Sequence, residues 1–83
     1  MTIYVGNLSY NTTEGDLREL FCVHGNIKSI SLPMDHETQR IKGFGFVEFA
    51  TVEDAIKAKE AMDGKELDGR EIKVDFAEDK REA

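Results

Sequence analysis

The segment Lys42-Gly43-Phe44-Gly45-Phe46-Val47-Glu48-Phe49 has the alternating pattern of a β-strand. Successive side chains of a strand point to opposite faces of its sheet. One face of this strand therefore carries both charges and two phenylalanines: Lys42, Phe44, Phe46 and Glu48. That face cannot be the core, because burying an unpaired charge costs several kcal/mol or more. We therefore expect Phe44 and Phe46 to point toward solvent.

Residues 2–6 indicate the same division of faces. Ile3 and Val5 alternate with Tyr4, so Tyr4 is expected opposite the core, on the face of the two phenylalanines. Exposed aromatic residues grouped on one face indicate a binding site, and a dimer interface on the same face is the structural alternative. Gly43 and Gly45 would face the helices, where a missing side chain lets a helix approach closely.

The rest of the chain alternates between strand and helix patterns. Thr13 with Asp16, and Thr51 with Asp54, resemble the capping signals at the start of helices. Val52, Ala55, Ala58 and Met62 mark the buried face of the second helix. The predicted elements are strands over residues 2–6, 27–32, 42–49 and 72–76, helices over 14–23 and between 51 and 64, a flexible loop over 34–41 and a hairpin at 68–69.

This βαββαβ order predicts an α+β, ferredoxin-like sandwich. Two split βαβ units with right-handed crossovers place both helices on one face of a four-stranded antiparallel sheet and leave the other face open. With 83 residues there is room for one domain, which we expect over residues 1–77. Residues 78–83 are expected to form a charged, flexible tail.

The composition of the chain disfavours several classes of function. Eleven basic and seventeen acidic residues give a net charge of −6, which disfavours a purely electrostatic binder of nucleic acid. The longest apolar run, residues 20–23, is far too short to span a membrane, and no signal peptide pattern opens the chain. The single cysteine, Cys22, cannot form an internal disulfide and fits a reducing compartment, so we expect a cytoplasmic protein.

An enzyme is disfavoured. Cys22 and His24 are two positions apart and do not face each other on a helix, and neither has a visible acid or base partner. Neither residue forms zinc-ligand spacing with His36. The glycines at 43 and 45 lack the third glycine of a dinucleotide loop. We expect no catalytic residues, no metal and no cofactor.

Two segments resemble the signatures of the RNA recognition motif family. Residues 3–8, Ile-Tyr-Val-Gly-Asn-Leu, are similar to its RNP2 signature, and residues 42–49 fit its RNP1 pattern at every defined position. The resemblance covers nearly the whole chain and is strongest to small bacterial and cyanobacterial RNA-binding proteins with a single such domain. It implies the sheet order 4-1-3-2, which places the two signature strands side by side.

The resemblance also implies a function, namely binding of single-stranded RNA by a monomer that acts as a post-transcriptional regulator or RNA chaperone-like factor. Tyr4 and Phe44 would each stack on a base, Phe46 would pack against sugars, and Lys42 would contact a phosphate. The expected secondary contacts are Asn7, Arg40, Lys73 and Lys80. Single-stranded DNA stays open as a ligand, because stacking does not distinguish the sugars.

Two residues depart from the family pattern. Lys59 occupies a helix position that is often apolar, so its stem would lie along the core edge with the amine in water. Asp75 would add a negative charge to the binding face. The alternative function is a protein-interaction module that uses the same face, which the net charge of −6 favours.

Overall fold

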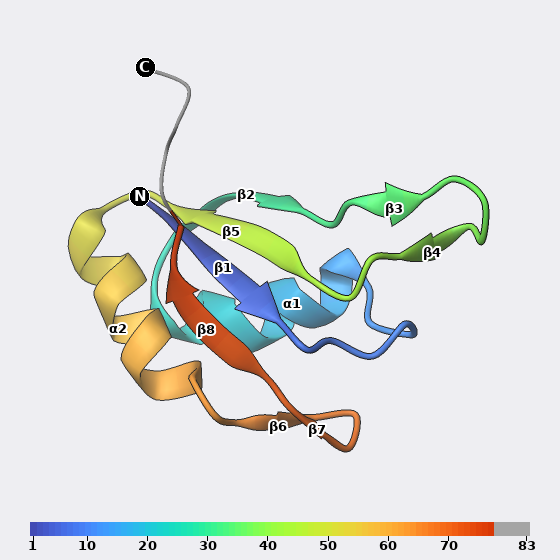
Figure 1. The fold of residues 1–83 in the computed structure, drawn as a ribbon. Helices are drawn as coiled ribbons and strands as arrows, with labels where there is room; N and C mark the ends of the chain where they lie inside the picture. Colours follow the sequence, from blue (N-terminus) through green and yellow to red (C-terminus); the bar gives the residue numbers. More distant parts are fainter. Residues whose placement is uncertain (78–83) are drawn as a thin grey trace.

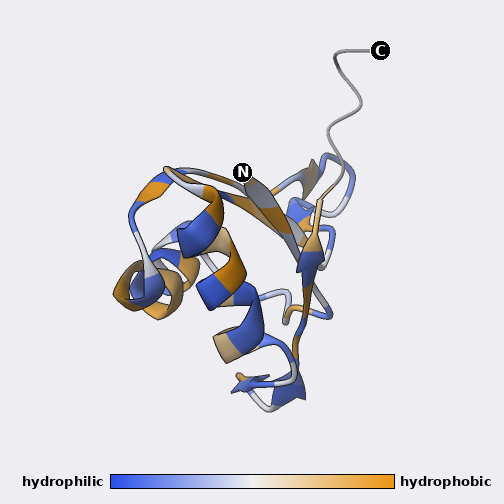
Figure 2. Cartoon of the chain, turned by 90° about the vertical axis from the view of Figure 1, so that its left-hand side faces the viewer, coloured by the Kyte–Doolittle hydropathy of each residue, from blue (hydrophilic) through white to orange (hydrophobic). Residues whose placement is uncertain are grey.

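The structure is a computed structural model that describes residues 1–77 of the chain (Figure 1). One antiparallel sheet has the order β2-β5-β1-β8. The labels β1, β2, β5 and β8 correspond to the predicted strands 1, 2, 3 and 4, so the predicted order 4-1-3-2 is confirmed. Its strands are β1 (Thr2–Gly6), β2 (Ile27–Ser31), β5 (Gly45–Phe49) and β8 (Lys73–Phe76). The helices are α1 (Glu14–Phe21) and α2 (Val52–Met62), and the short 3₁₀ helix η1 (Cys22–His24) follows α1. The view along the sheet shows both helices on the same side of it (Figure 2).

Strand register decides which side chains share a face. Tyr4 pairs with Phe46 on β5 and with Asp75 on β8, whereas Ile3 pairs with Val47 and Phe76. Directly paired residues of antiparallel strands project to the same face. Because Ile3 and Val47 are fully buried under the helices, Tyr4 and Phe46 lie on the open face, as predicted.

The core lies between the sheet and the helices. Phe21 of α1 packs edge-on against Phe49 of β5, with 6.5 Å between the ring centroids. The helices contribute five buried residues: Leu17, Phe21, Ala55, Ala58 and Met62. Val52 was predicted on the same buried face but is 51% exposed, because it is the first residue of α2 and lies beyond the buried stripe.

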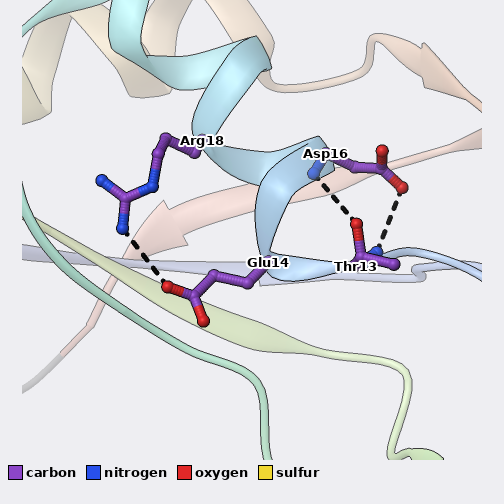
Figure 3. Close-up of polar contacts among 4 residues, drawn as sticks. All are labelled: Thr13, Glu14, Asp16 and Arg18. Atoms are coloured by element: carbon purple, nitrogen blue, oxygen red, sulfur yellow. Dashed lines mark hydrogen bonds and ion pairs between the residues drawn. The ribbon is translucent and has the colours of Figure 1, made fainter.

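Helix α1 begins with the predicted capping box (Figure 3). The amide of Asp16 donates to the Thr13 hydroxyl, and the amide of Thr13 donates back to the Asp16 carboxylate, both at 3.1 Å. These two bonds satisfy backbone donors that a helix start leaves free. The last predicted turn is tighter than an α-helix, so α1 ends at Phe21 and η1 continues to His24.

The flexible loop predicted over residues 34–41 is wrong. The segment forms a short hairpin of β3 (Met34–Asp35) and β4 (Arg40–Ile41), which projects beyond the sheet (Figure 1). The backbone amide of Gln39, a residue with φ 63°, donates a hydrogen bond to the Asp35 carbonyl and closes the turn. Two-residue strands are too short to produce a readable alternation, so the sequence pattern missed them.

The predicted strand over residues 42–49 begins only at Gly45. Gly43 has φ +92°, a conformation that favours glycine and bends the chain out of the pleat. Strand alternation therefore does not extend to Lys42. Gly45 was predicted to let a helix approach closely, but the close neighbour is strand β2: a Cβ on residue 45 would lie 2.8 Å from the Ser31 carbonyl oxygen. The prediction for Gly45 is therefore wrong.

The second hairpin consists of β6 (Glu66–Leu67) and β7 (Arg70–Glu71). The turn residues Asp68 and Gly69 both have positive φ, as a two-residue hairpin turn requires. On the helix side of β8, Phe76 is 43% exposed, and the Lys59 amine lies 5.6 Å from its ring centroid. Lys59 is half-buried, and its amine lies over the exposed ring of Phe76.

Candidate nucleic-acid interface

Three aromatic side chains gather on the open face of the sheet. Tyr4 comes from β1, Phe46 from β5, and Phe44 from the residue before β5 begins. The ring centroid of Tyr4 lies 5.9 Å from the ring centroid of each phenylalanine, and the two phenylalanine centroids are 5.8 Å apart. We call these three residues the aromatic platform.

The rings of the platform support one another. Tyr4 and Phe44 are inclined by only 28°, whereas Phe46 meets both of them edge-on. Offset-stacked and edge-to-face pairs at these distances are favourable beyond their buried area, by about 0.5 to 1.5 kcal/mol each. All three residues are half-buried, so part of each ring is open to a ligand.

Gly6 gives the Tyr4 ring its place. The two residues lie on the same face of β1, and a Cβ on residue 6 would lie 2.7 Å from Cε1 of the Tyr4 ring. The φ of Gly6 is not among the positive values in the chain, so the backbone does not require glycine there. The space beneath the tyrosine ring is what requires it.

Gly6→Ala should therefore displace the Tyr4 ring and leave the fold stable. The ring is the end of a flexible side chain, so it can move aside, and we expect the free energy of unfolding to change by less than about 1 kcal/mol. Nuclear Overhauser contacts between the Tyr4 and Phe44 rings should weaken or vanish. Unchanged contacts between these rings would show that Gly6 does not place Tyr4.

Charged side chains surround the platform. Lys73 pairs with Gly6, which places it on the open face as a candidate contact. Asp75 pairs with Tyr4, so its negative charge also lies on this face, as predicted. Toward β2, at the opposite edge of the sheet from β8, the Glu48 carboxylate accepts a 3.0 Å hydrogen bond from the Ser29 hydroxyl.

Asn7 links the end of β1 to the second hairpin. Its side-chain amide donates to the Glu71 carbonyl at 2.7 Å, and its Oδ1 accepts a 2.8 Å bond from Arg70. Arg70 Nε also donates to the Asn7 carbonyl at 3.3 Å. The predicted contact Asn7 is thus engaged within the protein and holds Arg70 in place. Arg70 was not among the candidates, because nothing local in the sequence connects it to the first strand.

Arg40 and Lys42 lie beside the loop that follows β1. The Arg40 guanidinium carbon lies 5.9 Å from the ring centroid of Tyr10, a residue that the sequence patterns did not single out. Both cations share the walls of the same hollow with Tyr10. The remaining candidate, Lys80, lies outside the described residues.

Other kinds of site have little support within residues 1–77. No group of three or more histidine, cysteine, aspartate or glutamate side chains there could hold a metal ion. The thiol of Cys22 is exposed and contacts the Glu19 carbonyl oxygen at 3.7 Å. No helix in this part of the chain is long and apolar enough to cross a membrane.

The sequence profile of the RNA recognition motif matches residues 3–73. The chain belongs to this family. RbpB of Nostoc sp., whose name describes it as an RNA-binding protein, is 49% identical over 93% of the chain and 75% of its own length. RbpA of Synechocystis sp., similarly named, is also 49% identical, over 93% of the chain and 76% of its own length. Both relatives agree with the predicted resemblance to cyanobacterial RNA-binding proteins.

Solved structures of RNA recognition motifs share the fold. The crystal structure of RNA-binding protein PG1 has a TM-score of 0.90 and 41% identity, over 96% of each chain. The RNA recognition motif of Rna15, solved with bound RNA (GU), has a TM-score of 0.86 and 27% identity, over 94% of this chain and 83% of that one. In the RNA recognition motif described here, Tyr4 and Phe46 lie on the two central strands, β1 and β5, and Phe44 immediately precedes β5.

Proposed function

We propose that this protein binds single-stranded RNA on the open face of its sheet. Tyr4 and Phe44 each stack on a base, Phe46 packs against the sugars between them, and Lys42 and Lys73 contact phosphates. The observation that carries the proposal is the gathering of three half-buried rings within 6 Å of one another on the face that no helix covers. The named RNA-binding relatives support it.

The net charge of −6 is compatible with this function. Stacking contributes about 1 to 3 kcal/mol per base and needs no positive charge. Six of the seventeen acidic residues lie on the two helices, behind the sheet, including Glu14, Glu19 and Glu53. Their repulsion is largely screened beyond about 8 Å at physiological ionic strength.

The proposed biochemical role is binding without catalysis. The family consists typically of non-enzymatic modules, and the sheet face offers rings and cations for holding a strand. We propose a monomeric, cytoplasmic protein that takes part in post-transcriptional regulation or acts like an RNA chaperone. Single-stranded DNA is a candidate second ligand, since base stacking is common to both nucleic acids.

NMR titration of isotope-labelled protein with a pool of short random single-stranded RNA tests the proposal. Changes in amide and aromatic chemical shifts should concentrate on the platform and on Lys73. The chemical shifts of residues on the outer surface of α1 should not change. A matched DNA pool measures the preference for ribose. Absence of shifts at millimolar RNA would contradict the proposal.

A protein-interaction module is the second candidate, favoured by the net charge of −6 and by Asp75 on the open face. It requires the same rings to contact a protein partner in place of bases. The Phe44→Ala, Phe46→Ala double variant distinguishes the two: for an RNA-binding module it removes the RNA-induced shifts, whereas for a protein-interaction module RNA binding is absent or unaffected by it.

A further inference from the structure

A basic hollow lies next to the aromatic platform. It has a volume of about 430 Å³ and lies between the loop after β1 and the residues that lead from β4 into β5. Its walls carry three cationic side chains and one aromatic ring: Arg40, Lys42, Arg70 and Tyr10. Among the residues that the structure describes, no carboxylate lines it. This concentration of positive charge contrasts with the net charge of −6 for the whole chain.

Tyr10 does not contribute to the core. It is 61% exposed, so much of its ring is open to a ligand. Its ring lies against the Arg40 guanidinium, 5.9 Å from the centroid. Tyrosine rings and arginine planes are the surfaces on which unpaired bases stack.

Two of the three cationic residues are anchored by hydrogen bonds within the protein. Arg70 uses two N–H donors on Asn7, at 2.8 and 3.3 Å, which leaves three of its five donors free for an anion. The backbone amide of Lys42 donates to the Pro33 carbonyl at 3.0 Å, which anchors Lys42 at the base of the first hairpin. Because the Arg70 guanidinium is already held by Asn7, it loses little conformational freedom when it binds a phosphate.

The hollow is connected directly to the platform. The Leu8 amide donates to the Gly43 carbonyl at 2.9 Å, so the loop after β1 is tied to the residue preceding Phe44. Lys42 lines the hollow only two residues before that platform ring. An RNA strand that leaves the platform on this side therefore enters the hollow next.

We infer that the hollow is a further nucleotide subsite of the same RNA strand. A backbone phosphate lies among Arg40, Lys42 and Arg70, and the adjoining base stacks on the exposed ring of Tyr10. This inference rests on the proposed function and extends the binding surface beyond the three platform residues. A neighbouring hollow shares Tyr10, Arg40 and Lys42 as lining residues but is also lined by Asp35, so the phosphate is assigned to the hollow without a carboxylate.

Oligonucleotide length provides the test. NMR titrations would compare pools of random three-nucleotide and eight-nucleotide RNA on wild-type protein and on Tyr10→Ala, Arg40→Gln and Phe44→Ala variants. Tyr10→Ala and Arg40→Gln should each weaken binding of the eight-nucleotide pool about tenfold and that of the three-nucleotide pool less than twofold. Arg40→Gln should also lower the log–log salt slope of the longer RNA by about 0.7, and Tyr10→Ala should not.

Arg18→Gln is the matched control, because it removes an exposed cation of α1 whose ion pair with Glu14 is solvent-exposed. It should leave both affinities unchanged. If Tyr10→Ala and Arg40→Gln leave the longer RNA unaffected, or weaken both lengths equally, the hollow is not a subsite. If Phe44→Ala has no effect on either length, the failure belongs to the proposed function itself.

Discussion

Replacing Phe44 and Phe46 together by alanine should lower RNA affinity by about tenfold or more while the protein stays folded. The base stacked on Phe44 contributes about 1 to 3 kcal/mol, the sugar contacts of Phe46 add to this, and 1.4 kcal/mol corresponds to a factor of ten in affinity. Both rings are half-buried, and the aromatic partners of each are the other two platform rings. Their removal leaves the core intact, so each should cost only about 1 kcal/mol of stability.

Fluorescence anisotropy with a labelled eight-nucleotide RNA pool would measure the affinity, and urea unfolding would measure the stability. Phe76→Ala is the matched control, since it removes an equally large and 43% exposed ring. Phe76 pairs with buried Ile3 and therefore lies on the helix side of the sheet. An equal loss of RNA affinity in this control, or full affinity in the double variant, would refute the role of the open face.

Phe49→Ala should destabilise the domain by about 3 to 5 kcal/mol. Phe49 is 1% exposed and packs edge-on against Phe21, so its removal leaves a cavity at the centre of the core. A domain of this size loses about 4 to 8 °C in melting temperature per kcal/mol, so the Tm should fall by at least about 12 °C. Thermal unfolding followed by circular dichroism would measure it.

Phe44→Ala is the comparison that gives this second measurement its meaning. It deletes the same side chain five positions earlier, from the opposite face of the sheet, and should shift the Tm by only a few degrees. Equal large losses at Phe44 and Phe49 would show that the assignment of faces is wrong. This comparison needs no ligand and is independent of the proposed function.

Local patterns predicted much of the fold and of the platform. Side-chain alternation is a property of the strand itself, so Tyr4, Phe46 and Phe49 could be placed on their faces before any pairing was known. The capping box of Thr13 and Asp16 spans three residues and was equally readable. The same reasoning failed at Lys42, because the positive φ of Gly43 interrupts the alternation that the prediction assumed.

The sequence by itself determined the two faces of the sheet, because burying Glu48 beside the phenylalanines would cost more than exposing two rings. Only the tertiary structure decided what surrounds the platform. Asn7 and Arg70 are 63 residues apart and meet through hydrogen bonds, and Tyr10 and Arg40 come together from the loop after β1 and from the two-residue strand β4. Loops and two-residue strands have no periodicity, so contacts between them depend on how the whole sheet brings distant segments together.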